Sequence, residues 1–370
     1  MTSSISPFSR YLEGKTCIYG EHQEDYRVRS KEAVVAGGYM AREKGPDIFS
    51  ELFNYFCLTR NQIAKDHHSA CAQIFGAPRS YDRSTQDIVY SCTFLSDQYT
   101  EYNKIFMAQL LPFITSMQRN GLKAATTIDC CLSHTNQIDL ELVSGEELQL
   151  YKSETIENEV EKLLGRRLSF ATIMHDSATL HAIRSRSMTL YKVLMKSMGI
   201  EHIYRSFPKK LEAESNTTFV IGTFRFELTK KMYSMSRFFT WFDNSTPDPI
   251  KTMDSDSIVA IFHQDPFLIE DTLQVIKQMF KNALSWNRDR DSLEDLKDRT
   301  SLFRFTFVQC TPSHRGDGSI GDWLELVIYL FHGFINTKFN DDRLPCFEPL
   351  ASLSLSRYRG TYDRIITISE

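Results

Sequence analysis

The sequence predicts an α/β protein with a largely parallel sheet, preceded by a mainly helical region. Before residue 120, apolar residues recur at three- and four-residue spacing, which is the period of an amphipathic helix. After it, short apolar segments alternate with amphipathic ones. Strands that alternate with helices favour βαβ units around a parallel sheet. We therefore expect an N-terminal helical region of unknown role at 1–120 and a sheet domain at 121–370.

The expected elements follow from the local pattern in chain order. Amphipathic helices are expected within 47–75 and 98–121, where Gly121 supplies a stop. Strands are then expected at 123–133, 168–176, 216–228 and 301–312, and helices at 145–167, 177–199, 265–286 and 321–335. The polar segments 244–249 and 287–299 are expected to be the least ordered. Reactive groups lie where parallel strands end, which directs attention to Ser133 and Asp176.

The composition is that of an ordinary globular protein and excludes several classes. The chain has 370 residues, 42% of them hydrophobic, and a net charge of −4, so nucleic acid would have to bind a local basic patch. The N-terminus lacks the apolar core of a signal peptide, and no run is long enough to span a membrane. The eight cysteines form no C-x-x-C pair. A cytoplasmic location without membrane contact is expected.

Cofactor motifs are absent or weak. No Gly-rich phosphate loop follows a strand, so no nucleotide cofactor is expected. Asp254 and Asp256 are too common a pattern to indicate a metal. The segment 312–324 is similar to the R-x-x-G-x-G turn of acetyltransferases, but Arg315 to Gly321 is one residue too long. A GNAT-like acyltransferase is therefore kept as an alternative.

A basic stripe is the clearest charge pattern. No acidic residue occurs between Ala178 and Ile200. At 100° per residue, basic side chains gather on one face, and we expect that face to point away from the sheet. A stripe of one sign predicts contact with phosphates. Its members are His181, Arg184, Lys192 and Lys196, followed by Arg205, Lys209 and Lys210.

Residues 131–137, C-L-S-H-T-N-Q, resemble the G-[LIV]-S-x-x-[ND]-S signature of the tRNA-dependent cyclodipeptide synthases. The apolar residue, Ser133 and Asn136 match, whereas Cys131 and Gln137 replace a glycine and a serine. The segments 333–338 and 354–359 resemble later motifs of that family, in the same order. The divergent fungal branch that makes arginine-containing cyclodipeptides is the most similar in size. The resemblance leaves 1–120 unexplained.

The resemblance implies a Rossmann-like fold, similar to the catalytic domain of class I aminoacyl-tRNA synthetases, and a specific reaction. Ser133 would take the aminoacyl group of one aminoacyl-tRNA, and a second aminoacyl-tRNA would supply the attacking amine, so that a diketopiperazine is released. The activated ester makes any cofactor or metal unnecessary. Roles are implied for residues at matching positions: Glu325 and Tyr329 for the ammonium group, in reversed order relative to the family's Y-x-x-x-E, with Tyr358 and Asn136 beside the serine.

If arginine is a substrate, its guanidinium requires a carboxylate. Asp139, Glu141 and Asp176 are the candidates nearest the serine or its partner strand. The alternative from another class is a non-enzymatic RNA-binding protein on a Rossmann-like scaffold. The synthase requires Ser133 and Glu325 in one pocket, the RNA-binding protein requires neither, and the acyltransferase requires a splayed strand leading into Arg315. The sequence leaves the two amino acids and the oligomeric state open.

Overall fold

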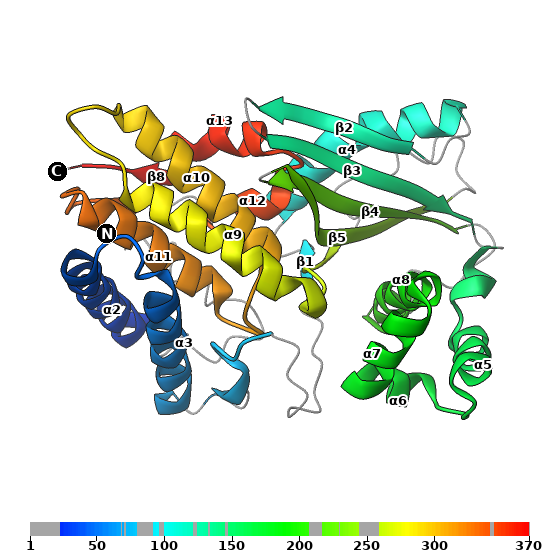
Figure 1. The fold of residues 1–370 in the computed structure, drawn as a ribbon. Helices are drawn as coiled ribbons and strands as arrows, with labels where there is room; N and C mark the ends of the chain where they lie inside the picture. Colours follow the sequence, from blue (N-terminus) through cyan, green and yellow to red (C-terminus); the bar gives the residue numbers. More distant parts are fainter. Residues whose placement is uncertain are drawn as a thin grey trace.

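The computed structural model combines an antiparallel sheet with helices on both of its faces and a helical layer at one end (Figure 1). It describes residues 23–67, 69, 72–79, 92–95, 100–120, 124–131, 134–144, 147–206, 217–228, 230–243, 259–340 and 344–369. The mixed α/β class predicted from the sequence is confirmed. None of the described helices is both long and apolar enough to cross a membrane.

The main sheet has six strands, and every neighbouring pair in it is antiparallel. Their order is β1-β6-β5-β4-β3-β2. The strands are β1 (Cys92–Leu95), β2 (Ala124–Cys131), β3 (His134–Val143), β4 (Thr217–Leu228), β5 (Lys231–Asp243) and β6 (Val259–Phe262). The Rossmann-like, largely parallel sheet predicted from the sequence is therefore wrong.

Connection lengths explain the correction. Only two residues separate β2 from β3, and two separate β4 from β5. Such short connections can join antiparallel strands only, because a parallel pair needs a crossover of about a dozen residues. The helices expected to be crossovers form an insertion between β3 and its antiparallel neighbour β4 instead. They are η4 (Glu147–Tyr151), α5 (Ser153–Leu164), α6 (Phe170–His175), α7 (Ser177–Arg186) and α8 (Met188–Ser206).

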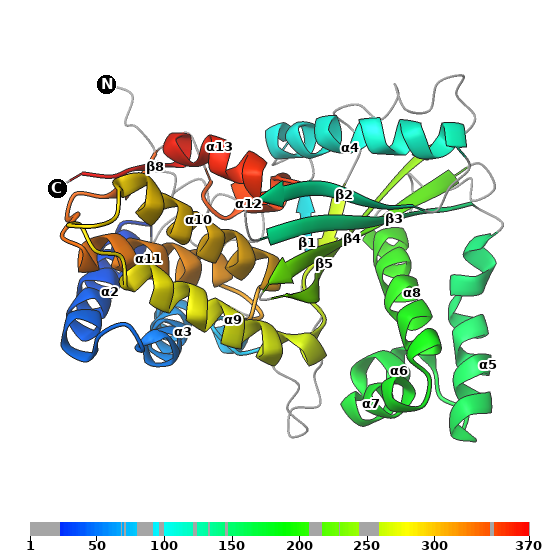
Figure 2. The same cartoon turned by 45° about the horizontal axis from the view of Figure 1, so that its top comes forward.

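The two faces of the sheet pack against different elements (Figure 2). Helix α4 (Thr100–Asn120) covers one face, where its Phe106 contacts Phe224 and Phe238. The opposite face meets α8, whose Ile200 and Ile203 join a smaller core with side chains of β4 and β5. The inserted helices also have an apolar core of their own.

A helical layer completes the fold at one end of the sheet (Figure 1). Its core runs from Tyr26 to Ile366, so the regions on both sides of residue 120 share it. Trp323 is fully buried in it, against Tyr26 and Phe56. The elements here are α2 (Gln23–Lys44), α3 (Phe49–Asp66), η2 (Ala72–Ile74), α9 (Pro266–Leu284), α10 (Leu293–Cys310), α11 (Asp317–Phe331), α12 (Phe347–Ala351) and α13 (Leu355–Ile365), with the two-stranded β7 (Lys338–Phe339) and β8 (Ile366–Thr367).

Three local predictions are corrected by the structure. The strand expected at 301–312 belongs mainly to α10, and the strand expected at 168–176 contains α6. Ser169 caps α6 by accepting a hydrogen bond from the Thr172 amide, as a helix N-cap does. The helix expected at 177–199 is two helices, because the chain becomes extended at Ser187.

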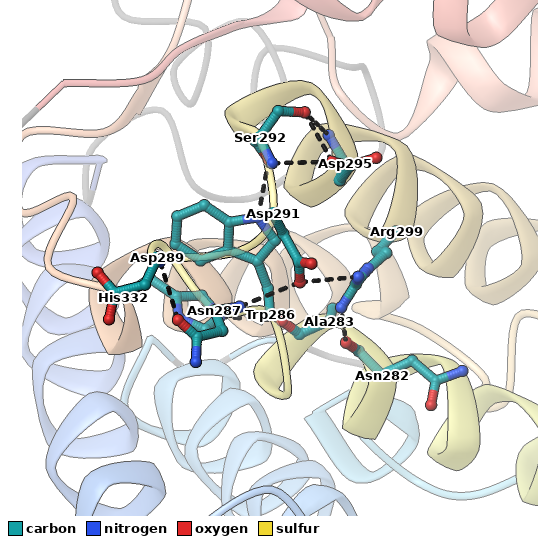
Figure 3. Close-up of polar contacts among 10 residues, drawn as sticks. All are labelled: Asn282, Ala283, Trp286, Asn287, Asp289, Asp291, Ser292, Asp295, Arg299 and His332. Atoms are coloured by element: carbon teal, nitrogen blue, oxygen red, sulfur yellow. Dashed lines mark hydrogen bonds and ion pairs between the residues drawn. The ribbon is translucent and has the colours of Figure 1, made fainter.

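The charged segment 287–299 is a hydrogen-bonded turn as far as Ser292 and the start of α10 from Leu293 onward, rather than a weakly ordered run (Figure 3). Ser292 and Asp295 form a capping box at the start of α10. The Trp286 indole donates to the Ser292 carbonyl at 2.7 Å, and Arg299 pairs with Asp291 at 2.9 Å. These contacts satisfy polar groups of the segment and hold its backbone in a defined conformation.

Candidate functional site

A cavity of about 460 Å³ lies between the outer face of the sheet and helices α7 and α8. This volume is in the range of small-molecule sites. We call it the sheet–helix pocket. Its charged side chains and its tyrosine are Asp139, Glu141, Arg184, Tyr191, Lys192, Lys196, Arg225, Arg237 and Asp265.

Strand alternation places the sheet's polar side chains in this pocket. On β3, Asp139 and Glu141 face the pocket, whereas Ile138 lies in the core on the opposite side. Thr223 of β4 stands opposite Arg237 of β5, and both line the pocket. The sheet thus contributes acids from one strand and arginines from two others to the same cavity.

Two ion pairs and one hydrogen bond organise its walls. Lys196 of α8 pairs with Glu141 of β3, which joins the inserted helices to the sheet. Arg225 contacts Asp139 at 3.1 Å. The Tyr191 hydroxyl donates to Asp265 at 2.7 Å. Side chains from distant parts of the sequence are therefore held in defined positions.

Three further cations give the pocket an excess of positive charge. Lys192 is exposed and Arg237 is partly buried, and within the described part of the chain neither forms an ion pair. Arg184 lies over the Phe267 ring, 4.8 Å from its centroid, a contact that leaves the guanidinium charge uncompensated. These side chains can accept an anionic group without breaking an existing ion pair.

The pocket unites residues that the sequence assigned to two roles. Asp139 and Glu141, expected to bind substrate, lie beside Arg184, Lys192 and Lys196, expected to bind tRNA. One expectation is wrong. The basic side chains line a pocket against the sheet instead of facing away from it. The expected single helix is interrupted at Ser187, and the strands that face it carry polar side chains.

Two further expected binding residues, Asp176 and His181, do not line the pocket. Asp176 caps α7 through the Ala178 amide at 3.1 Å and does not line the pocket. His181 is exposed and lies 6.2 Å from Phe267, ring to ring. Ser133, Lys209, Lys210 and the side chain of Arg205 are outside the described residues.

Glu325, Tyr329 and Tyr358, three of the expected catalytic residues, come together in a buried cluster rather than in a cleft. All three are at most 1% exposed. The Tyr362 hydroxyl donates to Glu325 and lies 3.0 Å from the Tyr329 hydroxyl. Arg304 of α10 pairs with Asp322 and lies 3.6 Å from the Glu325 carboxylate.

Burial dominates the electrostatics of this cluster. It raises the pKa of Glu325 to about 7 and that of Asp322 to about 6, against the opposing effect of the Arg304 guanidinium. It also raises the pKa of Tyr329, Tyr358 and Tyr362. The cation that lies beside Glu325 is thus Arg304, from within the fold, and Glu325 is buried in the core.

Asn136 lies on the core side of β3, on the face opposite to Asp139 and Glu141. It is 3% exposed, and neither amide atom has a hydrogen-bond partner among the described residues.

The segment 312–324 enters α11 through a buried turn. Gly316 has φ +92°, and Asp317 accepts a hydrogen bond from the Ser313 amide at 2.9 Å. The preceding element is helix α10, whereas an acetyltransferase site requires a strand at this position. The observed geometry therefore gives no support to the acyltransferase alternative.

Of the charged side chains and the tyrosine of the pocket, sequence reasoning missed four: Tyr191, Arg225, Arg237 and Asp265. A signal for Arg225 was present, since Thr223 and Arg225 alternate with Phe224 and Phe226 as on a strand with one polar face. Arg225 was not included because the polar face of the expected strand 216–228 was not considered as part of a site.

The fold and the pocket define the molecule as a mixed α/β protein with a charged sheet–helix site. No known protein-family model matches the chain, and no curated protein is significantly similar to it.

Proposed function

We propose that the protein binds a phosphate-bearing polar ligand in the sheet–helix pocket. The observation that carries the proposal is the presence of Arg184, Lys192 and Arg237, without carboxylate partners among the described residues, in a cavity of ligand size. Guanidinium and ammonium groups bind phosphate through charge-assisted hydrogen bonds. A neutral ligand would leave these charges unused.

Among the partners expected from the sequence, the aminoacyl end of a tRNA suits this arrangement. Its phosphates require cations, and its free ammonium group requires a carboxylate. Both kinds of group line the pocket: the cations are Arg184, Lys192 and Arg237, and the carboxylates are Asp265 together with Glu141 and Asp139, which are already paired with Lys196 and Arg225. Aminoacyl-tRNA is therefore the ligand that we propose to test first.

Replacing Lys192 and Arg237 together by alanine should weaken tRNA binding about tenfold or more and reduce its dependence on salt, because fewer counterions are released. Fluorescence anisotropy with a labelled aminoacyl-tRNA, at several salt concentrations, measures both effects. The matched control is Lys104→Ala with Arg357→Ala, which removes the same charge at exposed positions outside the pocket. Equal losses in the two double variants would mean that binding follows net charge alone.

The finer proposal is enzymatic: Ser133 takes the aminoacyl group, forming an ester as the terminal ribose oxygen of the tRNA leaves. With labelled aminoacyl-tRNA, we expect base-labile label on the protein that Ser133→Ala abolishes. The Lys192→Ala/Arg237→Ala variant should label more slowly. Undiminished label on the Ser133→Ala variant would contradict the role of the serine, and tRNA binding without any label would leave an RNA-binding function.

A further inference from the structure

A second cavity, of about 550 Å³, lies in the helical layer, between α2, α11 and β7. We call it the α2 groove. Its floor and walls are mainly aliphatic and aromatic, including Val28, Val34, Leu326, Leu330, Phe334 and Phe339. A cavity of this size lined by apolar side chains is the usual form of a site for an apolar ligand.

The groove carries exposed apolar surface. Val28 is 46% exposed, Val35 is 41% exposed, and Ile335, which also lines the groove, is 65% exposed. Covering such surface is favourable by about 25 cal/mol per Å² of apolar area. Exposed apolar surface gathered around one cavity marks a binding site more often than the same residues scattered singly.

The rim of the groove is basic. Arg27, Lys31 and Lys338 line it, together with the single acid Glu24. Arg27 pairs with Glu24 at 2.6 Å. Lys31 and Lys338 are exposed, and neither forms an ion pair with any residue that the structure describes. The rim therefore has two ammonium groups available to an anion, next to an apolar cavity.

We propose that the α2 groove binds a long-chain carboxylic acid, with its apolar chain among the valines and aromatic residues and its carboxylate at the rim with Lys31 and Lys338. This chemistry matches both properties of the groove. An apolar alcohol would use the walls only, and a small polar anion would use the rim only. The site is separate from the sheet–helix pocket, and no described residue lines both.

The test is calorimetric titration of the full chain with dodecanoate and, in parallel, with dodecanol. Dodecanoate should bind at least about tenfold more tightly than dodecanol, because a charge-assisted contact adds to the apolar one. Lys31→Ala with Lys338→Ala should remove this difference. The control Lys104→Ala with Lys277→Ala removes two lysines elsewhere and should keep it. Val34→Trp, which adds bulk at a partly buried wall position, should weaken both ligands.

Several outcomes would overturn the proposal. They include no binding of dodecanoate, equal affinity for the alcohol, or an affinity unchanged in the Lys31/Lys338 and Val34 variants. Loss of binding in Lys192→Ala/Arg237→Ala would place the acid in the sheet–helix pocket instead. Binding of an acidic amphipathic peptide in place of dodecanoate would identify the groove as a protein-docking surface.

Discussion

Replacing Arg304 by methionine is expected to lower the free energy of unfolding by about 3–5 kcal/mol, the usual cost of leaving a buried charge without its partner. Arg304 is fully buried, and its guanidinium pairs with Asp322 and lies 3.6 Å from Glu325. Gly321 permits this approach, because a Cβ at that position would lie 2.1 Å from the arginine. The variant keeps the apolar stem of the side chain but leaves two carboxylates without a cation.

Urea unfolding of the wild type and the variant measures the effect. Arg359→Met is the matched control, since Arg359 is partly exposed and its pair with Asp298 at 3.3 Å should contribute only about 0–1 kcal/mol. The cost of Arg304→Met should be greater at pH 8 than at pH 5, because protonated carboxyl groups no longer require the cation. Equal effects of the two substitutions would show that the buried cluster is not held by Arg304.

The free energy of unfolding should fall as pH rises from about 5 to about 8, and Glu325 should account for a large part of the change. Burial raises its pKa from the ordinary 4.5 to about 7. Between these values the folded state holds a proton that the unfolded chain has released, so stability present at low pH is lost as pH rises through 7. For one carboxyl group with this shift, the loss is roughly 2–3 kcal/mol over that range.

Glu325→Gln isolates this contribution, because glutamine stays neutral throughout. As pH rises from about 5 to about 8, the Glu325→Gln variant should gain roughly 2–3 kcal/mol of unfolding free energy relative to the wild type. Asp317→Asn should act in the same direction, since burial raises the pKa of Asp317 to about 7. A constant difference would mean that Glu325 is already ionised at pH 5. A variant with unchanged stability but no transfer activity would favour the catalytic role expected from the sequence.

Helices with a polar face and strands with clear alternation could be predicted from the sequence, and the structure contains them. Helices α3, α4, α5 and α9 and strands β2 and β4 lie within the expected segments, and α11 overlaps the helix expected at 321–335. Strand direction could not be predicted, because local patterning does not state whether an intervening helical segment crosses over the sheet or is inserted between antiparallel neighbours.

The strand predicted at 301–312 illustrates the limit of periodicity. In α10, every residue from Phe303 to Cys310 is buried, so the helix has no polar face there. The alternation of phenylalanine with Arg304 and Thr306 is typical of a strand exposed on one side. Arg304 belongs to the core because Asp322, eighteen residues later, supplies the countercharge. Only the tertiary structure brings that partner to it.

Only part of the candidate site could be predicted from the sequence, because some of its residues come together through the pairing of distant strands. The acid-free segment 178–200 indicated the basic side chains of α7 and α8 that line the pocket, and nearness to Ser133 indicated Asp139 and Glu141. The arginines of β4 and β5 join them through register, since Thr223 stands opposite Arg237. Pairing between distant strands cannot be inferred from either strand alone.

The insertion between β3 and β4 has a consequence for how this protein can diversify. It leaves the sheet after Val143 and returns at β4, where Val143 stands opposite Phe219, so both of its ends lie on adjacent, hydrogen-bonded strands. Its apolar core, which includes Ile156, Ile183 and Leu194, is separate from the main core. The insertion can therefore vary in sequence with little effect on the main core. Substitutions in it can reshape one wall of the pocket while the strands that form the other wall keep their pairing, so the shape and charge of the pocket can change without a change of architecture.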